Sequence, residues 1–279
     1  MLMKVFVTGG PRSGTTLCAH IFSALGCHNK AKILNSANAE DKYFEELINN
    51  LNLADSSDLD MRRCDISQYF YDYKFVASTE NIYLKYPMLT SLPAVEPCLK
   101  MEDNKTNYGF VAKEFLSHFD IIIYVERDSV MACKSELAYL TDICALNNIE
   151  VGNLDSFSGC YIAAHANTYR FLYEMAYSQK QEHKIHRIRL EDILNDPSNV
   201  LAKFGDILQI DIDKIVESVI LKTLLTSTKE DRAAPELYLL LCTFLGEMNR
   251  QFNRFQSSEI SYSEYMSKLF EMQSFLASH

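Results

Sequence analysis

The sequence predicts an α/β protein in which helices flank a parallel sheet, with a helical part after it. Strand-like segments alternate with helical patterns, and they occupy residues 4–8, 81–85, 120–126 and 184–190. This alternation is typical of parallel strands joined by right-handed crossovers. The segment DIIIYVE, residues 120–126, is apolar at consecutive positions, as expected for a strand covered on both faces. A glycine-rich turn joins the first strand to the first helix.

The helical patterns fill the intervals between these strands, at residues 14–26, 40–53, 87–96, 129–146, 158–179 and 197–208. The polar stretches 56–60 and 101–107 are expected to be surface loops. Strand signals stop after residue 210, and residues 235–252 and 262–278 are predicted to be helices. We therefore expect one domain over residues 1–279, with an α/β core up to residue 210 and a helical extension over 211–279.

Composition excludes several classes of protein. The chain has 279 residues and a formal net charge of −10, which argues against a general binder of nucleic acid or of anionic membranes. The eight cysteines form no C-x-x-C pair, as expected for reduced thiols. No apolar run approaches the roughly 20 residues of a membrane span. The first strand begins almost at Met1, where a signal peptide would have no room. We expect a cytoplasmic protein without a membrane span.

The turn after the first strand, GGPRSGTT at residues 9–16, resembles a phosphate-binding loop that lacks its lysine. A Walker loop has the pattern G-x-x-x-x-G-K-[ST]. Gly9 and Gly14 keep that spacing and Thr16 fills the last position, but Thr15 stands where the lysine belongs. Arg12 is the only cation of the loop. The alternative interpretation is a strand–turn–helix junction that binds no ligand.

The residue types of this loop suit a small anion. Glycines at positions 9, 10 and 14 allow a tight turn whose N–H groups converge, and the helix that follows adds the positive end of its dipole. Hydroxyls of Thr15 and Thr16 can add hydrogen bonds. A Walker lysine serves the β- and γ-phosphates of a nucleoside triphosphate. Its absence favours a donor with a single 5′ anionic group, whose charge Arg12 and the backbone neutralise without a metal.

The segment GGPRSGTTL, residues 9–17, resembles the 5′-phosphosulfate loop of sulfotransferases. These enzymes have the P-loop fold and use 3′-phosphoadenosine 5′-phosphosulfate (PAPS), so the resemblance implies sulfuryl transfer to a hydroxyl or amine. Arg12 stands where these enzymes carry a basic residue, and we expect it to act on the departing phosphate. The resemblance implies that the donor is held by Gly10, Pro11, Arg12, Ser13, Gly14, Thr15 and Thr16.

Sulfotransferases carry a second donor element, an arginine followed eight residues later by a serine, which together hold the 3′-phosphate. The segment YVERDSVMACKSELAY supplies Arg127 and Ser135 at this spacing. Arg127 follows a predicted strand and so leaves the carboxyl edge of the sheet, where ligands of open α/β sheets bind. A guanidinium can hold a phosphate by two hydrogen bonds. The alternative for Arg127 is a surface ion pair with Asp128 or Glu126.

Three further segments are similar to sulfotransferase segments, at residues 38–52, 83–93 and 188–210. The first departs from the usual N-x-x-G-Y-F-E core, because Asp41 and Lys42 replace its glycine. The last is expected only to build the fold, with a helix that starts at Asp196-Pro197 and turns its apolar face to the core. These departures from the sulfotransferase pattern affect the expected acceptor specificity more than the expected donor binding.

The acceptor must lose a proton, and the sequence leaves several candidate bases. Glu45 is the first choice by resemblance, with Glu40 as a competitor in the same segment, although Glu45 can also belong to a solvated helix face. His20 lies one turn after Thr16, where a packing role is the alternative. Lys85, at a strand end, can steady the transferring sulfonate or be an exposed charge.

Arg232, in the loop TSTKEDRAAPE, is the candidate for a basic residue that closes over the 3′-phosphate, and a solvated loop arginine is its alternative. No Cys or His pair has metal-ligand spacing, so no metal is expected. The acceptor stays open among a small molecule, a carbohydrate, a lipid headgroup and a peptide. The C-terminal helix can complete the core, cover the acceptor or form a homodimer contact. The alternative functions are a P-loop nucleotide or metabolite kinase and a non-catalytic nucleotide-binding relative.

Overall fold

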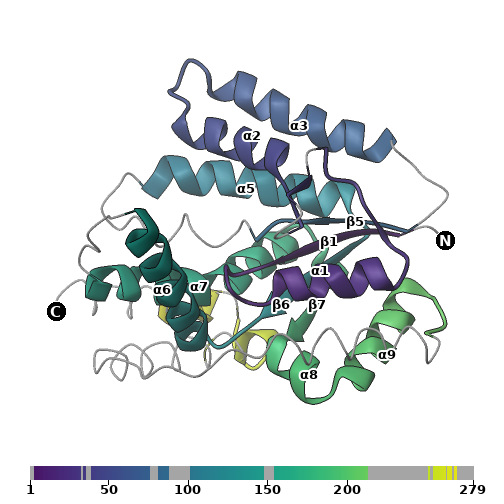
Figure 1. Cartoon of the computed structure of the whole chain (residues 1–279). Coiled ribbons are helices and arrows are strands. Elements are labelled where there is room, and N and C mark those ends of the chain that lie inside the picture. The colour runs from purple at the N-terminus through teal and green to yellow at the C-terminus, as the bar shows by residue number, and fades with distance from the viewer. Residues whose placement is uncertain are drawn as a thin grey trace.

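The computed structural model describes residues 3–32, 34–35, 39–75, 81–87, 101–147 and 154–212, together with 251, 254–261, 263–265 and 267–268 (Figure 1). The predicted helices at 87–96, 235–252 and 262–278 lie mostly outside these residues, as does Arg232. The division of the chain at about residue 210 therefore stays a prediction. None of the described helices is long and apolar enough to cross a membrane.

Five parallel strands form the central sheet, in the order β2–β5–β1–β6–β7. Their bounds are Lys4–Gly9 for β1, His28–Asn29 for β2, Ile82–Lys85 for β5, Ile121–Glu126 for β6 and Ile185–Arg189 for β7. Central β1 sets the register, since its Val5 pairs with Tyr83 of β5 and with Ile121 of β6. The predicted parallel sheet is confirmed, and its carboxyl edge carries the glycine-rich turn.

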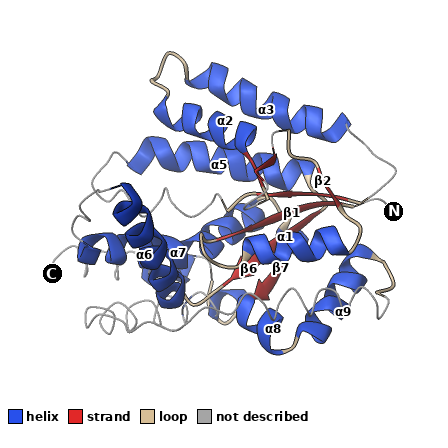
Figure 2. Cartoon of the chain, viewed as in Figure 1, coloured by secondary structure: helices blue, strands red, loops and turns tan. Residues whose placement is uncertain are grey.

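The helices lie on both faces of this sheet (Figure 2). Those before β6 are α1 (Thr15–Ala24), α2 (Lys42–Leu53), α3 (Leu59–Phe75) and α5 (Met101–His118). Those after it are α6 (Ser129–Asn147), α7 (Leu154–Ser178), α8 (Leu190–Asn195) and α9 (Pro197–Leu208), with a 3-10 turn, η2, at Glu182–Lys184. A short antiparallel pair, β3 (Leu34–Asn35) and β4 (Glu40–Asp41), precedes α2.

Of the two surface loops expected from the sequence, residues 56–58 form an exposed turn, whereas the other positions are helical. Residues 101–107 form the first half of α5, and residues 59–60 begin α3. The polar beginning of α5 concealed a helix whose apolar positions come later, because Val111, Phe115 and Phe119 are buried against the sheet. Spacing of four residues places Val111 and Phe115 on one face of the helix, and Phe119 directly follows its last residue.

The core consists of two layers because neighbouring residues of a strand face opposite sides of a sheet. Phe6 points to the layer that contains side chains of α2, α3, α5 and α7. Val5 and Val7 point to the other layer, against α1 and α9. All three side chains are fully buried. The central strand is thus covered on both faces, and it holds the turn that follows it in a fixed position.

Candidate functional site

Two glycines fix the path of the turn between β1 and α1. A Cβ atom on Gly9 would lie 2.2 Å from the carbonyl oxygen of Val125, so only glycine lets β1 end this close to β6. Gly14 is the N-cap of α1 with φ of 90°, a left-handed conformation that glycine adopts without steric cost. Added there, a Cβ atom would lie 2.6 Å from Leu190 Cδ1. The predicted loop is therefore built as its glycine spacing requires.

Carbonyl groups of the loop are held by side chains from elsewhere in the fold. The Tyr161 hydroxyl of α7 donates to the Pro11 carbonyl oxygen at 2.7 Å. Arg127 Nη1 donates to the Arg12 carbonyl oxygen at 3.1 Å. A helix cannot bond its first N–H groups internally, and those of α1 begin at the end of this loop. Together with the positive end of the α1 dipole, they favour an anion here.

The two predicted donor elements meet at the carboxyl edge of the sheet. Arg127 directly follows β6, and its guanidinium reaches the loop. In turn, the side chain of Arg12 reaches from the loop to the second element, where its Nε donates to Ser135 Oγ of α6 at 3.3 Å. Burial lowers the pKa of Arg127, while the Glu191 carboxylate opposes this change. Segments 115 residues apart thus place two guanidinium groups and one hydroxyl in a single cluster.

Arg12 occupies an unusual backbone position for a residue other than glycine. Its φ is 63°, in the left-handed region, which costs roughly 1–2 kcal/mol for an L-residue with a side chain. The contact of Arg127 with its carbonyl and that of Ser135 with its side chain hold it there. Its guanidinium points to α6, where Glu136 Oε2 lies 3.7 Å from Nε. The sequence placed Arg12 at the 5′ end of a donor, and the structure places it beside the predicted 3′ element.

Lys85 is buried at the other end of the loop. It ends β5 and is 1% exposed, so the alternative of an exposed end-of-strand charge is wrong. Its Nζ donates to Thr16 Oγ1 at 3.2 Å and forms an ion pair with Glu40 of β4. Burial lowers the pKa of Lys85, and Glu40 opposes this change. A cation and a carboxylate therefore lie together where the loop enters α1.

The remaining predicted residues differ in how far they are buried. Glu45 is exposed in the first turn of α2, and its charge adds to the burial that raises the pKa of Tyr86. His20 is exposed on α1. Ser13 and Thr15 are buried within the loop. Among the described residues, no group of three or more His, Cys, Asp or Glu is suited to hold a metal ion.

His165 of α7 contacts the loop, and sequence reasoning missed it. It is 4% exposed, its Nε2 lies 2.9 Å from Ser13 Oγ, and its Nδ1 lies 3.1 Å from Ser129 Oγ at the start of α6. The ring fits against Gly10 so closely that a Cβ atom there would lie 2.2 Å from it. The available signal was its spacing of four residues from Tyr161, which puts both on one face of α7. Nothing local indicated that this face meets the loop.

The protonation of His165 gives a testable pH dependence. Burial lowers the pKa of His165 from 6.5 to about 4; Asp128 opposes this shift and Arg127 adds to it. The unfolded chain therefore takes up a proton in a pH window where the folded chain does not, so stability falls as the pH falls from 6.5 to about 4. We expect wild type to lose on the order of 3 kcal/mol more than His165→Gln across this window in denaturant unfolding. Equal losses of unfolding free energy in the two proteins would contradict the lowered pKa of His165.

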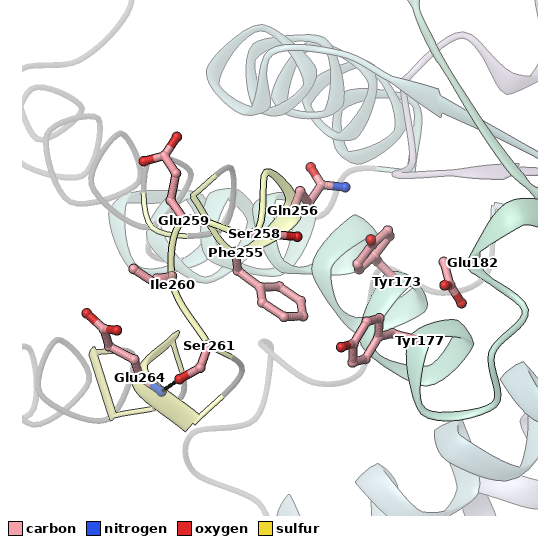
Figure 3. A pocket seen from close by; sticks show the side chains of 10 residues that line it. All are labelled: Tyr173, Tyr177, Glu182, Phe255, Gln256, Ser258, Glu259, Ile260, Ser261 and Glu264. Carbon is pink, nitrogen blue, oxygen red and sulfur yellow. Dashed lines mark hydrogen bonds between the residues drawn. The ribbon is translucent and has the colours of Figure 1, made fainter.

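A separate cavity of about 550 Å³ lies near the end of α7 (Figure 3). Its walls include Tyr173, Tyr177 and Phe255, with Glu182 at one side. Tyr177 is twelve residues beyond His165 on α7, which corresponds to about 18 Å along the helix axis. This cavity is thus separate from the cluster around the loop.

Comparisons with known proteins show the fold. The sequence matches no protein-family profile and has no significant relative among curated proteins. A sulfotransferase from Alicyclobacillus acidocaldarius superimposes with a TM-score of 0.51 at 13% identity, over 94% of this chain and 98% of that chain. A sulfotransferase from Mycobacterium avium gives 0.46 at 11% identity, over 85% and 71%. A deoxyadenosine kinase from M. mycoides with bound dATP gives 0.40 at 16% identity, over 74% and 99%.

Of these three structures, the sulfotransferase from Alicyclobacillus acidocaldarius has a TM-score above 0.5. Together with the strand order, it shows that the chain has a sulfotransferase-like P-loop fold, as the resemblance of its first loop implied.

Proposed function

We propose that the protein is a sulfotransferase that moves a sulfuryl group from PAPS to a hydroxyl or amine of a small molecule, carbohydrate or peptide in the cytoplasm. The observation that carries this proposal is the meeting of the glycine-rich loop, Arg127 and Ser135 at one edge of the sheet. The likeness of the whole fold to a solved sulfotransferase supports it.

The residues of the site fit a nucleotide with an anionic group at each end. Backbone N–H groups at the start of α1, with Thr15 and Thr16, suit the 5′-phosphosulfate. Arg127, Ser135 and Arg12 offer two guanidinium groups and a hydroxyl to the 3′-phosphate, and guanidinium forks match phosphate oxygens well. We propose Arg232 as a further basic residue over this phosphate.

We propose Glu40 as the general base, since it pairs with Lys85, whose Nζ also donates to Thr16. When bound, the donor supplies the sulfuryl group and leaves as 3′-phosphoadenosine 5′-phosphate (PAP). The acceptor oxygen or nitrogen forms the new bond to sulfur, the bond from sulfur to the 5′-phosphate oxygen breaks, and Glu40 takes the acceptor proton. Lys85 pairs with Glu40 and places positive charge beside the transferring group without a metal. Glu45 and His20 remain the alternative bases.

Titration with PAP without Mg²⁺ tests donor binding. At a concentration one hundred times its Kd, a ligand of the folded state stabilises it by about 2.7 kcal/mol. We expect PAP to raise the melting temperature and chelation to leave this rise unchanged. A rise with ATP and Mg²⁺ that chelation removes would favour the kinase alternative, and no rise with millimolar PAP would contradict the proposal. Turnover of PAPS with a panel of acceptors then separates an enzyme from a non-catalytic relative.

A further inference from the structure

Two carboxylates act on the guanidinium groups of the proposed 3′-phosphate site. Glu136 of α6 has its Oε2 3.7 Å from Arg12 Nε, and its side chain is 18% exposed. Glu191 of α8 acts electrostatically on Arg127, and it is more exposed, at 36%. The positive charge of Arg12 is therefore partly offset by the carboxylate in contact with it.

Glu136 is the better placed of the two carboxylates. It directly follows Ser135, and Arg12 Nε contacts both side chains, at 3.3 Å for the serine hydroxyl and 3.7 Å for the carboxylate. An anion that binds Ser135 and Arg12 therefore lies next to Glu136. Burial raises the pKa of Glu136, and the positive charge of Arg12 opposes this change.

We propose that Glu136 is a specificity-determining residue that competes with the 3′-phosphate of the donor for Arg12. This inference rests on the proposed function. A phosphate at this position competes with the carboxylate for the Arg12 guanidinium and is repelled by it, and partial burial weakens the screening of that repulsion. A nucleotide with only a 5′-phosphate avoids both costs. Glu136 therefore lowers the preference of the site for 3′-phosphorylated over unphosphorylated nucleotides.

The test compares PAP with adenosine 5′-phosphate, which lacks the 3′-phosphate, by calorimetric titration of the full chain. Glu136→Gln keeps the side-chain shape and removes the charge. We expect it to raise the affinity for PAP by about tenfold and to change the affinity for adenosine 5′-phosphate less than about twofold. The matched control is Glu174→Gln, which removes a carboxylate of equal exposure, 18%, that pairs with Arg170 on α7. The control should change neither affinity.

A loss of PAP affinity in Glu136→Gln would have a different meaning from the expected gain. If Glu136 mainly orients Arg12, Glu136→Gln weakens PAP binding, and that result overturns the inference while leaving the proposed function intact. An unchanged PAP affinity or an equal gain for both nucleotides also overturns it. Should wild type bind neither nucleotide, the inference and the proposed function both fail. Glu136→Met, of similar length and uncharged, repeats the test if the glutamine variant does not fold.

Discussion

Replacing Lys85 by methionine is expected to abolish sulfuryl transfer and to lower the free energy of unfolding by about 3 kcal/mol. Lys85 is 1% exposed and pairs with Glu40, whose side chain is 13% exposed. Removing one partner of a buried pair leaves the other charge uncompensated, which costs about 3–5 kcal/mol in measured cases. Methionine fills the space of the lysine stem without supplying charge. Denaturant unfolding and donor turnover measure the two effects.

The double variant Lys85→Met, Glu40→Gln separates charge from packing. It removes the Glu40 carboxylate, which Lys85→Met alone would leave without the lysine. We therefore expect the double variant to recover most of the lost stability and none of the activity. Glu40→Gln alone should still bind PAP but turn over at least about 100-fold more slowly, since it lacks the proposed base. If Glu40→Gln kept full turnover while Glu45→Gln lost it, the base would be Glu45 and the assignment of Glu40 would be wrong.

Replacing Arg127 by glutamine is expected to weaken PAP binding by about 100-fold or more. A charge-assisted hydrogen bond between arginine and phosphate contributes about 1.5–3 kcal/mol, and the guanidinium of Arg127 is also partly buried beside the loop. Adenosine 5′-phosphate should lose less affinity, because it lacks the group that Arg127 holds. Calorimetric titrations of both nucleotides give the comparison.

Arg127→Lys serves as the control for this prediction. It keeps the positive charge but cannot form two parallel hydrogen bonds, so we expect an intermediate loss of PAP affinity. Arg127 also donates to the Arg12 carbonyl, and a general disturbance of the loop would weaken both nucleotides equally. Equal losses for PAP and adenosine 5′-phosphate would therefore remove Arg127 from the 3′-phosphate site.

Much of the fold and part of the site follow from local sequence patterns. The apolar run of β6, the glycine spacing of the loop and the Asp196-Pro197 start of α9 each record a local requirement of the backbone. Such requirements can be recognised in short stretches of the amino-acid sequence. The eight-residue spacing of Arg127 and Ser135 was recognised only through the resemblance to sulfotransferases, and the structure brings both side chains to the loop.

The contacts that were missed depend on how distant segments pack. His165 meets Ser13 across 152 residues, and Lys85 meets Glu40 across 45. Periodicity showed which face of a helix is buried but not which loop that face covers. The partner of Arg12 was missed for a similar reason, because only the packing of α6 against the loop brings Glu136 to it. Pairings of this kind become visible in three dimensions.

The central claim is that the loop and the Arg127 element hold the two ends of one nucleotide. Hydrogen exchange of the wild-type chain, followed along a titration with PAP in the absence of Mg²⁺, tests it most directly. We predict slower exchange in peptides that cover residues 9–17 and in those that cover 127–136, with the same midpoint for both. Protection of one segment alone, or two different midpoints, would contradict the account.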